Sequence, residues 1–237
     1  MPSTAPALAF REFPDAASAA SALAGDVART LRAALASRAA ASLVVSGGRS
    51  PIGFFHELRD VPLDWARVTL TLADERWVDA SSDASNEHLV REHLLQGRAA
   101  AARFVGLKSA AASARAALPE REGALRDVLA GADMLVLGMG DDGHIASLFP
   151  QAAGLAEAMD LSKPPALVAI DPPHAPHARI SLNLPALLNA RASSLLIQGA
   201  AKRAVLERAC APGASEDLPI GAFARAARVP LNVYWSA

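Results

Sequence analysis

The sequence contains very little cysteine, few aromatic residues and no excess of charge of either sign. Cys210 is the only cysteine, so no disulfide can form within the chain, which is typical of proteins from a reducing compartment. Aromatic residues make up 5% and hydrophobic residues 52% of the 237 residues, so the core must consist mainly of Ala, Leu and Val. A formal net charge of −1 provides no basic surplus for a nucleic-acid backbone. An anionic ligand must therefore be held by a local group of Arg and Lys side chains.

Segments that would direct the chain into or across a membrane are missing as well. No window approaches eighteen apolar residues free of charge, so we predict no membrane span. Residues 1–18 lack the basic and apolar regions of a secretory signal, so we expect a cytoplasmic protein. Neither an internal repeat nor a low-complexity linker divides the sequence, and residues 1–237 are expected to form a single domain. No feature implies an oligomer, and a monomer and a dimer both stay open.

Short apolar runs alternate with stretches of helical periodicity. Leu23, Val27, Leu31 and Leu35 recur every four residues, which predicts a helix over about residues 15–40. The predicted strands are 42–46, 68–72, 104–107, 134–137, 166–170, 179–182, 195–197 and 231–235. The other predicted helices begin at Pro51 and cover 86–96, 112–130, 184–191 and 200–210. The alternation predicts an α/β fold, with a mostly parallel twisted sheet and helices on both faces. In such sheets ligands bind beyond the carboxyl ends of the strands, so the turns there are the first places to look for a site.

The first of these turns, residues 46–51, has the sequence SGGRSP and leads from a strand into a helix. Gly47 and Gly48 allow backbone N–H groups to approach a ligand closely, and a helix start favours an anion. Ser50 adds a hydroxyl donor and Arg49 a positive charge. These residues form a candidate phosphate cradle, although an ordinary tight turn has the same composition. The glycine-to-lysine spacing of a P-loop is absent.

The second turn, residues 73–78, has the sequence ADERWV and follows the strand 68–72. Arg76 could bind a phosphate with two hydrogen bonds or stabilise a developing oxyanion. Asp74 could act as a base, or it could hold Arg76 in place. The alternative interpretation is a solvated charged turn, which is the usual fate of three adjacent charges.

The third turn, residues 138–150, has the sequence GMGDDGHIASLFP. Its glycines fit the G-x-G-x-x-G fingerprint of a dinucleotide site, but Asp141 and Asp142 would repel a pyrophosphate. No acidic residue is clearly placed to bind a ribose, so a nicotinamide cofactor is disfavoured. The turn instead presents His144, whose unperturbed pKa of about 6.5 suits a general base. A neighbouring carboxylate can fix the tautomer of such a histidine.

These three segments, in this order and at these separations, resemble the 6-phosphogluconolactonase family. That family belongs to a wider sugar-phosphate fold shared with glucosamine-6-phosphate deaminases. The resemblance extends over about residues 10–235 and includes SNEHL from Ser85, RISL from Arg179 and GAAK from Gly199. Ser181 replaces a threonine of the family pattern, which retains a hydroxyl. The resemblance implies hydrolysis of 6-phospho-D-glucono-1,5-lactone to 6-phosphogluconate, the second step of the oxidative pentose phosphate pathway.

The resemblance and the chemistry of the residues together predict roles for the site. By resemblance, Arg179 and Lys202 bind the phosphate of a small-molecule substrate. The expected phosphate ligands besides these two are Gly47, Gly48, Ser50 and Arg49. His144 would remove a proton from the attacking water, while Arg76 or backbone N–H groups near Gly140 stabilise the oxyanion. Asp74 and Asp142 are both candidates for orienting His144 or Arg76. The scheme requires no organic cofactor and no metal.

Two other functions fit the sequence less well than hydrolysis of a lactone. Deaminases of the same fold carry a glutamate where this chain has Phe149, and phenylalanine cannot transfer a proton. A non-catalytic sugar-phosphate sensor would need only the phosphate ligands, so the presence of His144 beside the Asp-Glu-Arg turn disfavours it. His174 and His177 have the H-x-x-H spacing of metal ligands, but their loop is rich in proline and no third ligand is evident.

Overall fold

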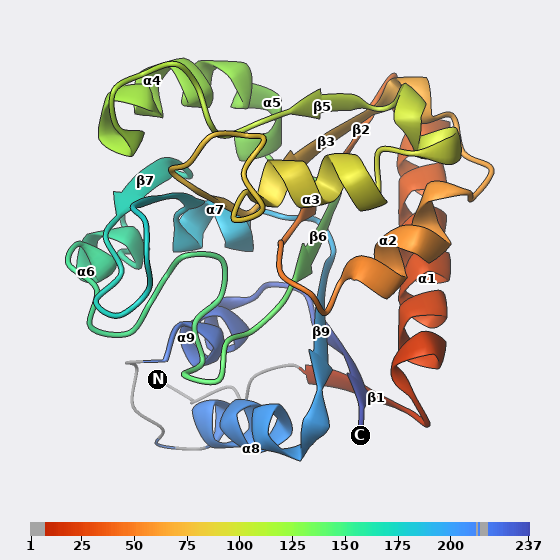
Figure 1. Cartoon of the computed structure of the whole chain (residues 1–237). Helices are drawn as coiled ribbons and strands as arrows, with labels where there is room; N and C mark the ends of the chain where they lie inside the picture. Colours follow the sequence, from red (N-terminus) through yellow and green to blue (C-terminus); the bar gives the residue numbers. More distant parts are fainter. Residues whose placement is uncertain (1–7, 212, 214–217) are drawn as a thin grey trace.

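A seven-stranded parallel sheet forms the centre of the molecule (Figure 1). The computed structural model describes residues 8–211, 213 and 218–237. All neighbouring strands of this sheet run parallel. Across the sheet the strands are β1 (Leu8–Phe13), β10 (Leu231–Ser236), β9 (Ser193–Gln198), β6 (Met134–Leu137), β2 (Ala41–Val45), β3 (Val68–Leu72) and β5 (Arg103–Val105). The prediction of a mostly parallel α/β sheet is confirmed, whereas strand β1 was not predicted.

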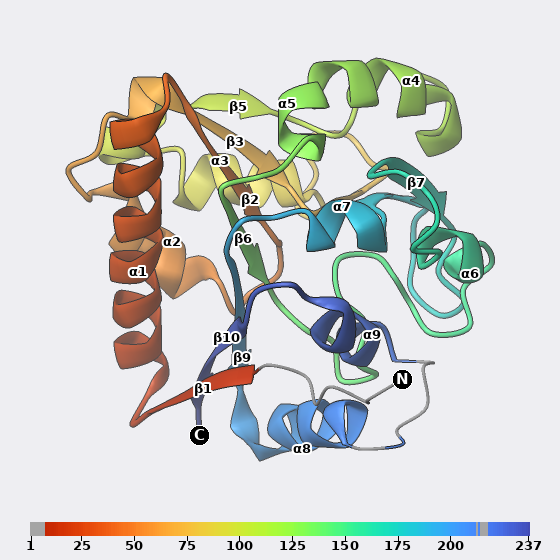
Figure 2. The same ribbon diagram turned by 180° about the vertical axis from the view of Figure 1, so that it is seen from behind.

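Helices cover both faces of this sheet. In Figures 1 and 2, α1 and α2 lie on one side of the sheet, with α7 and α9 on the other. The helices are α1 (Ala16–Ser37), α2 (Ile52–Arg59), α3 (Asn86–His93), α4 (Ala114–Ala124), α5 (Arg126–Leu129), α6 (Leu155–Ala158), α7 (Leu184–Leu188), α8 (Gly199–Cys210) and α9 (Pro219–Ala226), with short 3₁₀ turns η1 (Trp65–Arg67) and η2 (Gly97–Ala101). Within the described residues, none of these helices has the length and apolar character needed to span a bilayer.

The first helix follows directly from the sequence pattern. Asp15 caps it by accepting a hydrogen bond from the backbone N–H of Ser18, which satisfies one of the free donors at the helix start. Leu23, Val27 and Leu31 are fully buried, so the four-residue repeat forms the face that packs on the sheet. The predicted helix 112–130 is wrong in one respect, because Leu125 leaves the helical conformation and separates α4 from α5. Helices α6 and α9 were not predicted.

A second, smaller sheet stands beside the first. It is antiparallel and consists of β4 (Asp74–Arg76), β8 (Arg179–Leu182) and β7 (Leu167–Ile170). The prediction of a turn at residues 74–76 is therefore wrong. The backbone there pairs with β8, and the ladder continues on either side of the strand through Trp77 N to Ala178 O (2.7 Å) and Leu182 N to Ala73 O (2.9 Å). The alternative of a solvated turn is also wrong, since Glu75 is completely buried.

The order of the strands brings the three polar segments together. β6, β2 and β3 are neighbours in the large sheet, and all three run in the same direction. The segments that follow them, beginning at Gly138, Ser46 and Ala73, must therefore meet at one edge. The small sheet adds β8, and with it Arg179, to the same edge.

Candidate active site

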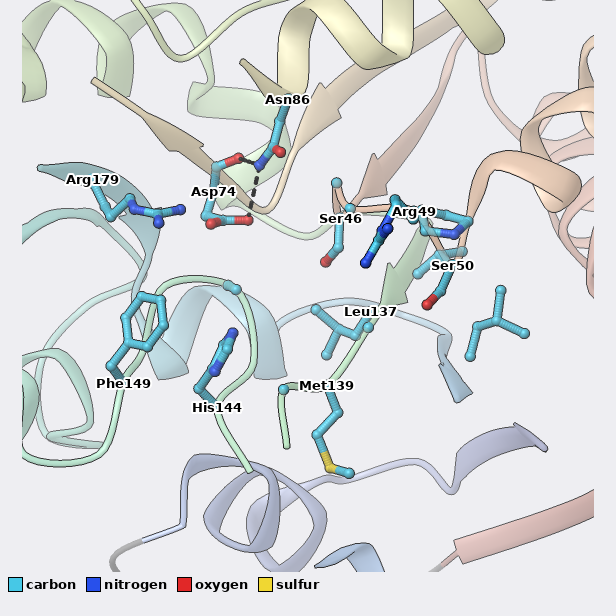
Figure 3. A pocket seen from close by; sticks show the side chains of 18 of the residues that line it. Ser46, Arg49, Ser50, Asp74, Asn86, Leu137, Met139, His144, Phe149 and Arg179 are labelled. Atoms are coloured by element: carbon cyan, nitrogen blue, oxygen red, sulfur yellow. Dashed lines mark hydrogen bonds between the residues drawn. The ribbon is translucent and has the colours of Figure 1, made fainter. Parts of the chain in front are cut away.

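A cavity of about 420 Å³ lies beyond the carboxyl ends of β2, β6 and β9 and against the small sheet (Figure 3). It is lined by all but one of the residues predicted for the site. These are Gly47, Gly48, Arg49, Ser50, Asp74, Arg76, His144, Arg179 and Lys202. The exception is Asp142, which does not line the cavity but forms a hydrogen bond with His144. Residues from five separate segments of the sequence thus meet around one space of a size suited to a small molecule.

The turn between β2 and α2 presents free backbone donors. Gly48 has a φ of 92°, a left-handed conformation that glycine adopts without strain. The N–H groups of residues 47–50 form no hydrogen bond with any other residue that the structure describes. Pro51 precedes the first turn of α2, so no side chain caps this helix. Free N–H groups at a helix start form a site for an anion.

The small sheet presents charged side chains to the cavity. Asp74 pairs with Ser181 and Arg76 with Arg179 in the ladder between β4 and β8. Because side chains alternate along a strand, these four share one face and Glu75 lies on the other. Two arginines directly opposite each other repel, so this pair of cations destabilises the sheet unless an anion binds between or beside them.

Arg76 and Arg179 each have a hydrogen-bond donor that is not used within the described residues. Arg179 is 6% exposed, and its Nη2 donates to the carbonyl oxygen of Pro176 over 3.3 Å. Arg76 donates from Nη1 to the carbonyl oxygen of Ala84 over 2.7 Å. Within the described part of the chain, the buried Nε of each arginine has no partner. Burial lowers the pKa of Arg179, the carboxylate of Asp74 opposes this shift, and the charge of Arg76 adds to it.

Asp74 is held from two sides and does not bond to His144. Its Oδ2 accepts a short hydrogen bond from Ser147 Oγ. Asn86 donates from Nδ2 to the backbone oxygen of Asp74 over 2.9 Å and approaches its Oδ1 at 3.4 Å. With both carboxylate oxygens engaged, Asp74 is a fixed negative charge beside Arg179 (Figure 3).

His144 is oriented by Asp142. Its Nδ1 lies 2.6 Å from Asp142 Oδ1, which also accepts from the backbone N–H of His144 over 3.1 Å. A carboxylate can only accept, so Nδ1 carries the proton and Nε2 is left as the basic nitrogen. The ring of Phe149 lies against the imidazole, with 4.2 Å between the ring centroids. Gly140 makes room for this arrangement, because a Cβ there would lie 2.2 Å from the imidazole.

Lys202 lies in the first turn of α8 and lines the cavity. Its Nζ is 4.0 Å from Asp141 Oδ1, and the side chain of Asp141 is 88% exposed. A pair of this length and exposure contributes little, so the ammonium group remains able to bind a ligand.

Glu75 is a structural residue of the site that the sequence did not reveal. Its carboxylate accepts hydrogen bonds from Arg76 N (2.7 Å), Ser85 Oγ (2.9 Å), Asn86 N (2.8 Å) and Glu87 N (2.7 Å). Burial raises the pKa of Glu75, and these four donors limit the rise. A negative charge at the start of α3 also faces the positive end of the helix dipole. Glu75 therefore fastens the start of α3 to the back of β4.

Asn86 and Ser147 were also missed as site residues. Ser85 and Asn86 resemble an ordinary helix start, and Ser85 does cap α3 by accepting from His88 N. Nothing in this local pattern shows that the side chain of Asn86 enters the cavity. Ser147 follows His144 in the sequence but faces Asp74, which is 73 residues away.

His174 and His177 both lie exposed on the loop before β8 and do not line the cavity. Across residues 8–211, 213 and 218–237, no group of three or more His, Cys, Asp and Glu side chains is arranged to hold a metal ion.

The fold and the site define an α/β protein whose cavity brings together a turn with free backbone N–H groups, the cationic side chains of Arg76, Arg179 and Lys202, and a histidine oriented by a carboxylate. Residues 14–235 match the family model described as glucosamine-6-phosphate isomerases/6-phosphogluconolactonase. The chain therefore belongs to this family, as its sequence motifs predicted.

Individual relatives agree with this assignment. The chain is 47% identical over 220 residues to a 6-phosphogluconolactonase of Pseudomonas aeruginosa, covering 93% of this chain and 91% of the relative. The crystal structure of a 6-phosphogluconolactonase from Shewanella baltica superposes with a TM-score of 0.91 at 41% identity, covering 97% of this chain and 98% of that one. A monomeric glucosamine-6-phosphate deaminase superposes with a TM-score of 0.79 at 18% identity over 97% of both chains, which shows the shared fold alone.

Proposed function

We infer that this chain is a 6-phosphogluconolactonase. It hydrolyses 6-phospho-D-glucono-1,5-lactone to 6-phosphogluconate, the second step of the oxidative pentose phosphate pathway. The observation that carries the assignment of chemistry is the Asp142–His144 hydrogen bond, which leaves a basic nitrogen on a histidine that lines the cavity. The names of the relatives, at 40–47% identity over most of the chain, support the substrate.

The phosphate is bound by the turn between β2 and α2 together with two cations. The free N–H groups of residues 47–50 and the hydroxyl of Ser50 donate to its oxygens, with Arg49 as a helper. Lys202 and Arg179 supply the compensating charge. Binding at this end fixes the lactone ring and reduces the entropy that must be lost to reach the reactive pose.

Hydrolysis then requires one proton to move twice. The oxygen of a water molecule attacks the lactone carbonyl while His144 Nε2 accepts a proton from that water. Asp142 stabilises the imidazolium that forms. Arg76, or backbone N–H groups near Gly140, stabilise the tetrahedral oxyanion. The oxyanion collapses, the bond from the carbonyl carbon to the ring oxygen breaks, and His144 returns its proton to that oxygen. Water and side chains suffice for these steps.

Phe149 supports this reaction over the deamination catalysed by other members of the family. It lies against His144, where a deaminase of this fold has a glutamate, and it cannot relay a proton. We further propose that residues 1–237 form one domain that acts in the cytoplasm.

Proton release with fresh 6-phosphogluconolactone in weak buffer tests the function. Acid should form faster with the protein than without it, and a chelator should leave the rate unchanged. A rate equal to spontaneous hydrolysis would refute the assignment. Ammonia release from glucosamine 6-phosphate would then be the next measurement, and tight binding of 6-phosphogluconate without hydrolysis would indicate a sensor.

A further inference from the structure

Asn86 lines the cavity, and the oxygen of its side-chain amide accepts no hydrogen bond from the described residues. It is the first residue of α3, is 2% exposed and lines the cavity beside Asp74 (Figure 3). Its Nδ2 donates to the backbone oxygen of Asp74, which can only accept, so the orientation of the amide is fixed. Its Oδ1 accepts no hydrogen bond from any residue that the structure describes.

The position of that oxygen is equally well fixed. The backbone N–H of Asn86 donates to Glu75, which fastens the start of α3 to β4. On the other side, a Cβ at Gly47 would lie 1.9 Å from Asn86 Oδ1, so the oxygen lies directly against residues 47–50, the proposed phosphate turn between β2 and α2. Asn86 Oδ1 is thus a rigid acceptor between the phosphate turn and Asp74.

A second buried asparagine shows what a purely structural role looks like. Asn183 is also 2% exposed, and it caps α7. Its Oδ1 accepts from Ala166 N (3.0 Å) and Ala186 N (2.9 Å), and its Nδ2 donates to Pro164 O (2.9 Å). Both the oxygen and the nitrogen of that amide have partners within the protein. The oxygen of Asn86 has no donor among the described residues, and Asn86 lines the cavity, so this oxygen is free to accept from a donor that arrives with the ligand.

We propose that Asn86 is a specificity-determining residue whose Oδ1 accepts a hydrogen bond from a ring hydroxyl of the sugar phosphate. A carbonyl oxygen next to the carboxylate of Asp74 repels an anion, so neither the phosphate nor the product carboxylate binds there. It suits a neutral O–H group on the carbons between the phosphate and the reacting carbonyl. In a 1,5-lactone these are the hydroxyls on C2, C3 and C4. The inference rests on the proposed function for the identity of the ligand.

A binding cycle tests the contact. The wild type, Asn86→Ala and Asn183→Ala are titrated calorimetrically with 6-phosphogluconate and with its 2-deoxy, 3-deoxy and 4-deoxy forms. The wild type should bind one deoxy compound about tenfold more weakly than the parent, as expected for a lost hydrogen bond. Asn86→Ala should bind 6-phosphogluconate and that deoxy compound with equal affinity. Asn183→Ala should show the same difference in affinity between them as the wild type. If Asn86→Ala does not fold, Asn86→Ser, which keeps a polar side chain at the start of α3, serves in its place.

Unchanged discrimination in the Asn86 variants would overturn the proposal. So would an equal loss of affinity for all four compounds and for inorganic phosphate, since that indicates a collapsed site. Failure of the proposed function has a separate signature, because the wild type would then neither hydrolyse the lactone nor bind 6-phosphogluconate. If the wild type hydrolyses the lactone and binds 6-phosphogluconate, but Asn86→Ala discriminates among the deoxy compounds as the wild type does, then only the role proposed for Asn86 is wrong.

Discussion

At His144, the hydrogen bond to Asp142 decides which ring nitrogen can accept a proton. Asp142→Asn removes the charge that stabilises the imidazolium and weakens the preference for the proton on Nδ1. We expect kcat to fall on the order of ten- to a hundredfold, less than the loss on removing His144 itself. The neighbouring carboxylate of Asp141 offers a matched control, because it is exposed and its one ion pair within the described residues is the 4.0 Å contact with Lys202. Equal kcat values for Asp141→Asn and Asp142→Asn would contradict the assigned role.

Glu75 gives a pH dependence of stability whose sign follows from burial. Its pKa is raised in the folded protein, so the folded state holds this proton more tightly than the unfolded chain. The contribution of Glu75 is therefore greatest below its ordinary pKa and is lost as the pH rises through the folded-state value. Glu75→Gln lacks this titration, although it also loses hydrogen bonds at every pH. The free energy of unfolding in urea should show the advantage of the wild type over Glu75→Gln shrinking as the pH rises above the ordinary pKa of a glutamate. An advantage that grows with pH would show that the four donors outweigh burial.

The start of α3 and the phosphate turn are coupled through Gly47. A methyl group at Gly47 would overlap the amide of Asn86, so Gly47→Ala must displace the turn, α3 or both. We expect KM for the lactone to rise on the order of tenfold or more, because the phosphate ligands lose their alignment. In an Asn86→Ala background the overlap is gone, and the same change at Gly47 should cost much less. Additive effects in this double-mutant cycle would exclude the coupling. Gly53→Ala in α2 is the control, since its Cβ would meet only Ala20 Cβ at 3.6 Å.

The elements that the sequence predicted well are those whose pattern is local. A short apolar run such as residues 134–137, which ends at a glycine, favours a buried strand, and the four-residue repeat from Leu23 favours one helix face. Strand β4 has no such pattern, because Asp-Glu-Arg has low strand propensity and its partner lies about a hundred residues further on. Candidate ligands on strand-end turns were predicted because parallel strands end at one edge. Asn86 and Ser147 were not, because their roles depend on how α3 and β8 dock.

At the scale of the whole molecule, a polar cluster that ties α1 to the sheet lies apart from the cavity. Tyr234 on β10 donates its hydroxyl to Asp26 on α1, and Arg11 on β1 bonds to both. None of these three lines the cavity. Burial and the carboxylate of Asp26 raise the pKa of Tyr234 to about 12, so the hydroxyl remains a donor near neutral pH.

This separation predicts a variant that loses stability and keeps activity. Tyr234→Phe retains the ring, which stacks on Phe13 with 5.8 Å between centroids, and removes only the hydroxyl. Because the lost bond reaches a charged but partly exposed partner, the free energy of unfolding should fall by about 1 to 2 kcal/mol. Urea unfolding measures this change, and kcat/KM for the lactone at a temperature well below the transition should equal that of the wild type. A matching fall in kcat/KM would mean that the packing of α1 on β10 and β1 reaches the carboxyl ends of β2 and β6, and that the sheet is not a rigid platform for the site.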